Sequence, residues 1–405
     1  MPSSNLSALL SNRPYVRFWF TRITSVTASQ MLMVAIAWHM YDITSSAWDL
    51  GLVGLFQFVP ALLLTLPAGH VADRHHRGRI LSLCLSLQFT TALLLVSASH
   101  WNFATRELML GISVMLGVAR AFQMPAQQSL MPLLVPPSLL QRAIAFGSSG
   151  MQIAIICGPA LGGLLYVYGP TTVYATAASL LLAAIIFALG IRYKHTPVAM
   201  AASWESVMAG LKFVWQRKMV LGATTLDLFA VLLGGATALL PIYARDILHT
   251  GPAGLGLLRA APAAGALVAS VALLRWPLRR HVGPKLLAAV AVFGLATVVF
   301  GLSHSFVLSL FALIITGAAD SISVVVRSTL IQLETPNEMR GRVSAVNSIF
   351  IGASNQLGEF ESGATAAAFG AVGSVVLGGV GTLLIAAGWF KLFPALAQRD
   401  RMENP

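Results

Sequence analysis

Charged residues are scarce in this sequence. Asp, Glu, Lys and Arg together make up 10% of its 405 residues, whereas 57% are hydrophobic. Soluble domains carry about a quarter of their residues as charges, so this composition excludes an ordinary soluble protein. A mean hydropathy of +0.78 and repeated apolar runs of membrane-spanning length indicate an integral membrane protein instead.

Cysteine and acidic residues are also few, and each shortage excludes a kind of site. The two cysteines, Cys84 and Cys157, both stand in apolar runs, so neither a disulfide framework nor a metal site is expected. The 14 acids against 26 Lys and Arg leave a net charge of +12, but a membrane protein keeps basic residues in cytoplasmic loops for topological reasons. Because no surface of interleaved basic and aromatic residues is present, nucleic-acid binding is not expected. The sequence also lacks paired catalytic acids and a nucleophile motif, which argues against an enzyme.

Twelve apolar runs are long enough to cross a bilayer as helices. They cover residues 16–41, 49–71, 80–99, 107–131, 141–166, 171–191, 219–244, 252–274, 284–303, 306–331, 343–369 and 372–393. Most Lys and Arg fall in the N-terminal segment, in every second loop and after the last run, which places both termini in the cytoplasm. We therefore expect an all-α, multi-pass monomer in the lipid bilayer of the plasma membrane, the inner membrane of a bacterium.

A polar connection divides the runs six and six. The expected parts are an N-terminal six-helix bundle over 1–191, a cytoplasmic linker over 192–218, a C-terminal six-helix bundle over 219–393 and a cytoplasmic tail over 394–405. In the linker, Trp204, Val207, Leu211 and Val214 recur at helical spacing beside basic residues. This pattern predicts an amphipathic helix at the membrane interface, with a plain linker as the alternative.

The two halves also match each other at one constant shift. Arg142 corresponds to Arg342, Gly158 to Gly358, and Gly163 to Gly363. Coincident glycine and arginine positions indicate a duplicated six-helix unit, and such transporters bind substrate near the membrane midplane between two pseudo-symmetric halves.

The densest cluster of charges runs from Gly69 to Arg79, between the second and third apolar runs. One charged side chain at the bilayer centre costs about 3 kcal/mol. We therefore expect this segment to be a short loop at the cytoplasmic surface.

Several motifs resemble those of the major facilitator superfamily. Gly69, Asp73, Arg74, Arg77 and Arg79 are similar to its loop motif between helices 2 and 3, and Arg120 with Gln123 resembles its helix 4 motif. Gly158, Pro159, Gly162 and Gly163 are similar to the helix 5 signature of its antiporter branch. Three segments, Asn12–Trp19, Leu239–Asp246 and Asn355–Gly363, resemble the branch of bacterial efflux proteins that contains the enterobactin exporter.

The resemblance implies a fold of twelve helices in two six-helix bundles that exports a small molecule in exchange for protons. It implies that the proton gradient is the energy source, and no cofactor is expected. The glycine-rich helix is implied to seal the pathway against proton leak. The loop motif is implied to gate the pathway, with Asp73 meeting the cytoplasmic start of helix 11.

Charges inside the apolar runs are costly and are therefore functional candidates. Those that lie away from the ends of the runs are Arg22, Arg120, Asp227, Arg259, Asp320, Arg327, Glu359 and Glu361. The alternative is that acids and bases pair and hold helices together.

Asp227, Asp320, Glu359, Glu361 and Arg120 are the proton-coupling candidates. Asp227 is the only ionisable residue in its run, so it is the first choice, with pairing to Arg22 or Arg259 as the alternative. Asp320 corresponds to Arg120 in the internal repeat. Both are expected to face the central cavity, where a cation favours the ionised form of a carboxyl group and apolar surroundings favour the neutral form. Glu359 and Glu361 lie about 200° apart around a helix, so only one of them can face the cavity.

The substrate cavity is expected to lie between the halves. Its expected lining is Arg22, Gln30, Met33, Trp38, Phe56, Arg259 and Arg327, although the aromatic members could equally serve helix packing. The resulting hypothesis is a proton-coupled exporter of a siderophore or of drugs. An importer or facilitator of a small nutrient with the same fold is the alternative.

Overall fold

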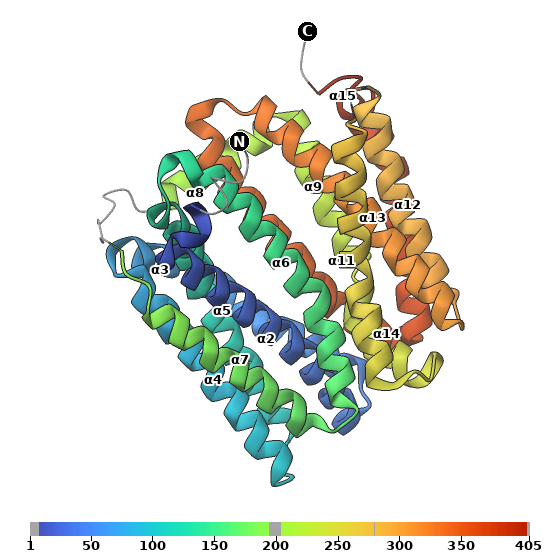
Figure 1. Ribbon diagram of the computed structural model, residues 1–405. Helices are drawn as coiled ribbons and strands as arrows, with labels where there is room; N and C mark the ends of the chain where they lie inside the picture. Colours follow the sequence, from blue (N-terminus) through green and yellow to red (C-terminus); the bar gives the residue numbers. More distant parts are fainter. Residues whose placement is uncertain (1–7, 194–203, 279, 403–405) are drawn as a thin grey trace. The chain divides into compact units, whose positions relative to one another are not determined.

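The structure is a computed structural model that describes residues 8–193, 204–278 and 280–402 (Figure 1), except the side chains at positions 66, 73 and 204–206. All regular elements in these ranges are helices, and eleven of them are long and apolar enough to cross a membrane. The longest, α14 (Asn337–Leu392), covers two of the predicted runs, because Gly370 breaks its helical backbone with φ 77° and ψ 162°. The predicted fold of twelve membrane-crossing helices is therefore confirmed.

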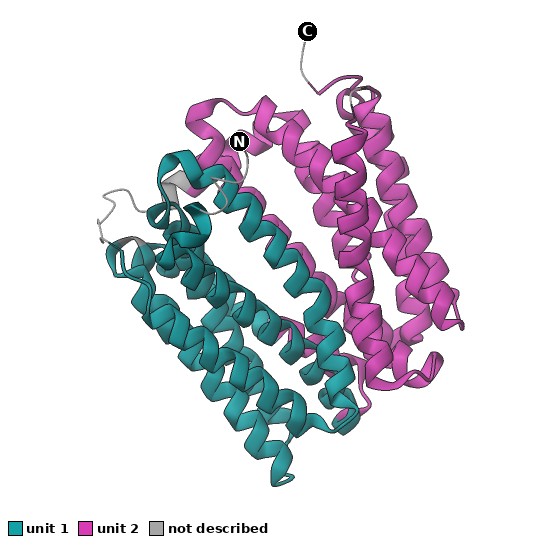
Figure 2. Ribbon diagram, in the orientation of Figure 1, with its two compact units in different colours: residues 1–43, 56–202 teal, residues 44–55, 203–405 magenta. Residues whose placement is uncertain are grey.

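Residues 1–43 and 56–202 form one compact unit (unit 1, teal in Figure 2). Its helices are α2 (Arg13–Thr44), α3 (Ala47–Arg74), α4 (Arg77–His100), α5 (Arg106–Leu134), α6 (Pro137–Tyr166) and α7 (Pro170–Leu189). Proline at the first turns of α6 and α7 favours these starts, since its fixed φ suits a helix. The amide of Asn12 donates to the carbonyl of Leu134 at 2.8 Å, and the hydroxyl of Tyr15 donates to the carbonyl of Ala143 at 2.8 Å. These bonds join the start of α2 to α5 and α6.

Residues 44–55 and 203–405 form the second unit (unit 2, magenta in Figure 2). Its elements are α8 (Trp204–Gln216), α9 (Lys218–Leu233), η1 (Ala236–Leu239), α10 (Leu240–Ile242), η2 (Tyr243–Ile247), α11 (Gly251–Arg275), α12 (Val282–Leu302), α13 (Phe306–Glu334), α14 and α15 (Pro394–Ala397). Helix α13 packs on α11 and α12, and α14 packs on α9 and α12. The first turns of α3 belong to this unit because Gly51 lets α3 approach Gly363 of α14 closely.

The helix expected in the linker is present as α8. Its Val214 is 2% exposed and packs with Val220, Val343 and Val346, which belong to α9 and α14. One apolar side of α8 is thus covered by α9 and α14, whereas Trp215 of the same helix is 73% exposed, and its place at the membrane interface stays a prediction. The side chain of Trp204 lies outside the described residues.

The last described residues are also packed. Leu396 and Ala397 are buried, and the carbonyls of Arg399 and Asp400 accept hydrogen bonds from the first backbone amides of α12, those of Gly283 and Val282, at 2.8 and 3.2 Å. These amides have no partner inside their own helix, so the segment after α15 caps α12.

Candidate functional site

A broken helix marks the interior of unit 2. Helix α9 ends at Leu233, and the chain passes through Gly234 and Gly235 into η1, α10 and the π-helical η2 before Gly251 starts α11. The break frees backbone carbonyls, and two of them gain side-chain donors. The hydroxyl of Ser362 donates to the carbonyl of Gly235 at 3.0 Å, and the guanidinium of Arg259 donates to that of Thr237 at 3.4 Å. Interrupted helices in transporters line cavities that hold substrate or ions.

A cavity of about 230 Å³ lies beside this break. Its walls come from all five long helices of unit 2. They include the backbone of Gly234 to Thr237, the polar side chains of Thr297, Thr316, Asp320, Asn355 and Glu359, and the rings of Phe293 and Phe300. A mixed polar and aromatic lining of this size can hold several water molecules or a small polar group.

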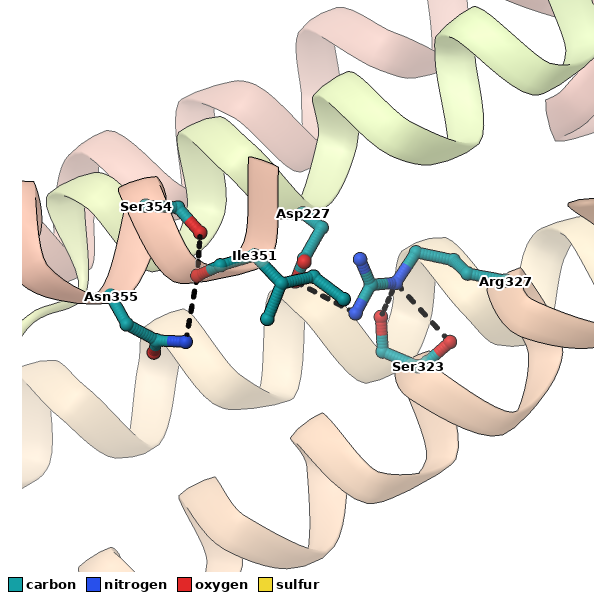
Figure 3. A network of polar contacts seen from close by, with 6 residues as sticks. All are labelled: Asp227, Ser323, Arg327, Ile351, Ser354 and Asn355. Carbon is teal, nitrogen blue, oxygen red and sulfur yellow. Dashed lines mark hydrogen bonds and ion pairs between the residues drawn. The ribbon is translucent and has the colours of Figure 1, made fainter. Parts of the chain in front are cut away.

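Asp227 of α9 forms an ion pair with Arg327 of α13. Their Oδ1 and Nη2 atoms lie 2.7 Å apart, and their side chains are 9% and 5% exposed. The Nε of Arg327 also donates to the hydroxyl of Ser323 at 3.1 Å and to its carbonyl at 3.3 Å, so Figure 3 shows the guanidinium held between α9 and α13. The expectation that Asp227 is a lone acid is wrong, and so are the partners suggested for it. Sequence spacing did not indicate Arg327, because the contact crosses from one helix to another.

Asp320 stands one turn before Ser323 on α13. Its side chain lines the cavity and is partly buried. No hydrogen bond or ion pair joins it to another residue of the described ranges. A carboxylate without a cationic partner in such a site is costly unless it is protonated or meets a cation.

Glu359 of α14, which also lines the cavity, pairs with Arg259 of α11 at 3.5 Å. Glu361 is half-buried and has no hydrogen bond or ion pair to its side chain from the described residues. The interior of unit 2 therefore holds four acids and two arginines that pair with two of them. Asp320 is the uncompensated acid that lines the cavity.

The candidates in unit 1 are not gathered into one cluster by the described contacts. Arg22 is partly buried, its Nε has no acceptor among the described residues, and its guanidinium carbon lies 5.9 Å from the ring centre of Phe18. Arg120 is exposed, as is Phe56. Met33 is partly buried, and Trp38 is buried with its ring 6.3 Å from that of Tyr166.

The glycine-rich part of α6 lies against α2. Gly158, Pro159, Gly162 and Gly163 are all buried. A Cβ atom added to Gly158 would lie 2.7 Å from the Cβ of Gln30, and one added to Gly162 would lie 3.0 Å from the Cα of Met31. The close packing expected of these small residues is present, whereas their sealing role stays a prediction.

The basic segment is not the loop that its charges predict. Helix α3 continues through Gly69 to Arg74, and α4 begins at Arg77, so the connection is only His75 and His76. Arg77 is 3% exposed and donates from Nε to the carbonyl of Ala72 at 3.3 Å and from Nη1 to that of Ser129 at 3.2 Å. Its charge is stabilised by these two carbonyls, of which that of Ala72 lies in the last turn of α3, so it can stay buried beside two exposed arginines, Arg74 and Arg79. The side chain of Asp73 lies outside the described residues, and its gating contact stays a prediction.

Other polar groups of the interior were missed. Ser323 and the glycine pair 234–235 were not singled out, although two adjacent glycines in an apolar run are a sign of a helix break. In unit 1, His39 contacts the hydroxyl of Tyr174 through Nδ1 at 3.0 Å, and Gln88 donates to Gln123 at 2.6 Å. These contacts join buried polar side chains to each other.

Known proteins share this sequence pattern and this fold. The model of the family described as transmembrane secretion effector matches residues 4–404. The chain belongs to this family of the major facilitator superfamily. The enterobactin exporter of Citrobacter koseri is 26% identical over 404 residues, which cover 94% of this chain and 88% of that protein. The staphyloferrin A transporter of Staphylococcus aureus is 28% identical over 172 residues, which cover 42% of this chain and 43% of that protein.

Two solved structures have the same fold. A bacterial homolog of the human lysosomal transporter Spinster has a TM-score of 0.73 at 16% identity and covers 95% of this chain and 98% of its own. A bacterial homologue of the iron transporter ferroportin has a TM-score of 0.71 at 15% identity, with 96% and 99% covered. This family member is therefore a multi-pass membrane transporter and not an enzyme.

Proposed function

We propose that this transporter is a proton-coupled antiporter that exports a small organic molecule, a siderophore or a drug-like compound, by alternating access. The observation that carries the proposal is Asp320, an acid without a partner among the described residues that lines a cavity beside a broken helix. Protonation of Asp320 changes the charge of this interior by one unit. The other cavity acid, Glu359, is already paired with Arg259, so Asp320 is the better candidate for proton exchange. A change of charge at a buried site shifts the relative stability of two conformations.

The proposal places the protein in the inner membrane of a bacterium as a monomer, with both termini in the cytoplasm. The basic loops support this orientation. The relatives named as an enterobactin exporter and a staphyloferrin A transporter support a siderophore as cargo. An importer or facilitator of a nutrient is the alternative. An importer would move its substrate inward, and a facilitator would not require a pH gradient.

We expect deletion of the gene to remove a small metabolite from the culture medium of cells grown without iron. The measurement is mass spectrometry of spent medium from wild-type and deletion cells, grown with and without iron. Re-expression of the chain is the control and should restore the metabolite. Identical media in all conditions would contradict siderophore export, and a metabolite that rises in the medium on deletion would indicate import.

We expect Asp320→Asn to abolish transport driven by a pH gradient, because an amide cannot exchange a proton. Everted membrane vesicles with iron-free enterobactin or ethidium as the probe give the measurement, with a protonophore to collapse the gradient. The matched control is Glu107→Gln, which removes an acid whose side chain is 77% exposed. Full gradient-driven transport in Asp320→Asn would remove Asp320 from the coupling scheme.

A further inference from the structure

A second, smaller cavity lies next to the one described above. Its volume is about 10 Å³, and its polar lining consists of Asp227, Asp320 and Ser323. The remaining walls are apolar and include Ala230 and Ala319. A space of roughly this size holds one water molecule when two to four polar groups line it. We call it the water chamber.

Asp320 lines both cavities, as do Val231 and Phe293, so the water chamber adjoins the larger cavity at these residues. Asp227, whose carboxylate holds Arg327, lines the chamber but not the larger cavity. The series of groups that connects the larger cavity to the ion pair is therefore Asp320, the chamber, Asp227 and Arg327. Figure 3 shows the last part of this series, with Asp227 and the guanidinium of Arg327 pointing toward one another.

We propose that one water molecule in the chamber passes a proton from Asp320 to Asp227, and that this proton weakens the Asp227–Arg327 pair that joins α9 to α13. In this step the carboxylic acid of Asp320 gives its proton to the water oxygen, and the water gives another proton to the carboxylate of Asp227. Asp320 becomes ionised, Asp227 becomes neutral and the total charge is unchanged. Because an unpaired carboxylate is costly in this interior, the step requires a cation in the larger cavity beside Asp320. The inference rests on the proposed proton coupling and assigns it a route.

Among the described residues, few other ionisable groups could exchange a proton with Asp320. The ionisable residues that face the two cavities are Asp227 of α9, Asp320 of α13 and Glu359 of α14, with Arg327 and Arg259 as their neighbours. Helix α12 contributes Val290 and Phe293 to the chamber, and neither side chain ionises. Glu359 has Arg259 as a partner and lines the larger cavity. Asp227 is thus the acid that shares the chamber with Asp320.

Weakening this pair changes how two helices are joined. An ionised carboxylate and a guanidinium form a charge-assisted hydrogen bond, which is about twice as strong as one between neutral groups. Once Asp227 is neutral, Arg327 keeps its contacts to Ser323 on its own helix but holds α9 less firmly. The α9 side of this link lies seven residues before the helix break at Gly234. Proton arrival is thereby coupled to the mobility of the broken helix.

We expect Ala319→Val to fill the chamber and to lower pH-gradient-driven accumulation by about 100-fold or more, as expected when a positioned proton-transfer group is lost. The protein is reconstituted in liposomes with iron-free enterobactin or ethidium as the probe. Exchange of labelled probe at equal pH on both sides should continue at the wild-type rate, because it needs substrate movement but no net proton transfer. Ala312→Val is the matched control. It adds the same two methyl groups at a residue that is 3% exposed, like Ala319, two turns away on α13, and it should keep both activities.

The outcomes separate the two proposals. A wild-type protein without any response to the pH gradient overturns the proposed function and the relay with it. A responsive wild type together with an equally responsive Ala319→Val overturns the relay alone. Loss of accumulation in both valine variants also overturns the relay, since added volume on α13 then explains the loss. If Ala319→Val does not fold, Ala230→Val fills the chamber from its α9 wall, and the same expectations apply to it.

Discussion

Arg327→Met is expected to lower the free energy of unfolding by about 3–5 kcal/mol, because removal of one partner of a buried ion pair leaves the other charge uncompensated. The carboxylate of Asp227 is 9% exposed and would lose the 2.7 Å contact to Arg327. Methionine keeps most of the length of the side chain, so the lost charge rather than a cavity dominates the effect. The measurement is the thermal unfolding of detergent-purified protein, followed by size-exclusion chromatography after heating.

The double variant Asp227→Asn/Arg327→Met isolates the pair from its surroundings. It should recover a large part of the lost stability, because a neutral amide tolerates this site without a cation. Proton-driven transport should stay absent in both variants. Arg275→Gln, which changes an exposed arginine in the last turn of α11, is the control and should stay within about 0.5 kcal/mol of wild type. Equal stability of the single and double variants would show that Asp227 and Arg327 do not stabilise each other.

The sequence predicted the membrane helices well because their signal is local. Apolar length and basic loops mark each span without any knowledge of its neighbours. The high cost of charge in a bilayer also correctly singled out Asp227, Arg327, Arg259 and Glu359 as interior charges that need a function or a partner. These four residues form two ion pairs in the structure.

The pairing itself could not be predicted from the sequence. Asp320 and Arg327 are two turns apart on α13, which suggested a shared cavity, but Arg327 reaches across to α9. Which helix lies opposite a side chain depends on packing of segments that are far apart in the chain. The same reason hid the role of Arg77, whose partner Ser129 lies on α5. Backbone carbonyls of a neighbouring helix can accept from a charged residue, and sequence spacing does not show which helices meet.

The cavity was also beyond the sequence, since it depends on how closely α11 and α13 approach. Gly265 of α11 lies against the backbone of Ile314, and Gly317 of α13 lies against the backbone of Pro262. This reciprocal contact brings together the two helices that carry Arg259 and Asp320 beside the cavity. Pro262 and Gly317 line the cavity themselves.

Gly317→Ala is expected to destabilise the protein by about 3 kcal/mol or more, at or beyond the upper end of the usual cost of overpacking. A Cβ atom at Gly317 would overlap the carbonyl group of Pro262, which is backbone and cannot rotate away. Helices α11 and α13 would therefore have to separate, and the cavity between them would change shape. Thermal unfolding of the purified protein, together with probe transport by the fraction that remains folded, gives the measurement.

Gly352→Ala is the control for this change. It makes the same substitution in α14, where a Cβ atom meets nothing within 4 Å. Alanine favours a helix over glycine by about 0.5–1 kcal/mol, so this variant should be as stable as the wild type or more stable. The expected changes in stability have opposite signs because of the interhelical contact alone, since helix propensity favours alanine at both positions. If Gly317→Ala were as stable as Gly352→Ala, α11 and α13 could not be in the close contact that shapes the cavity around Asp320.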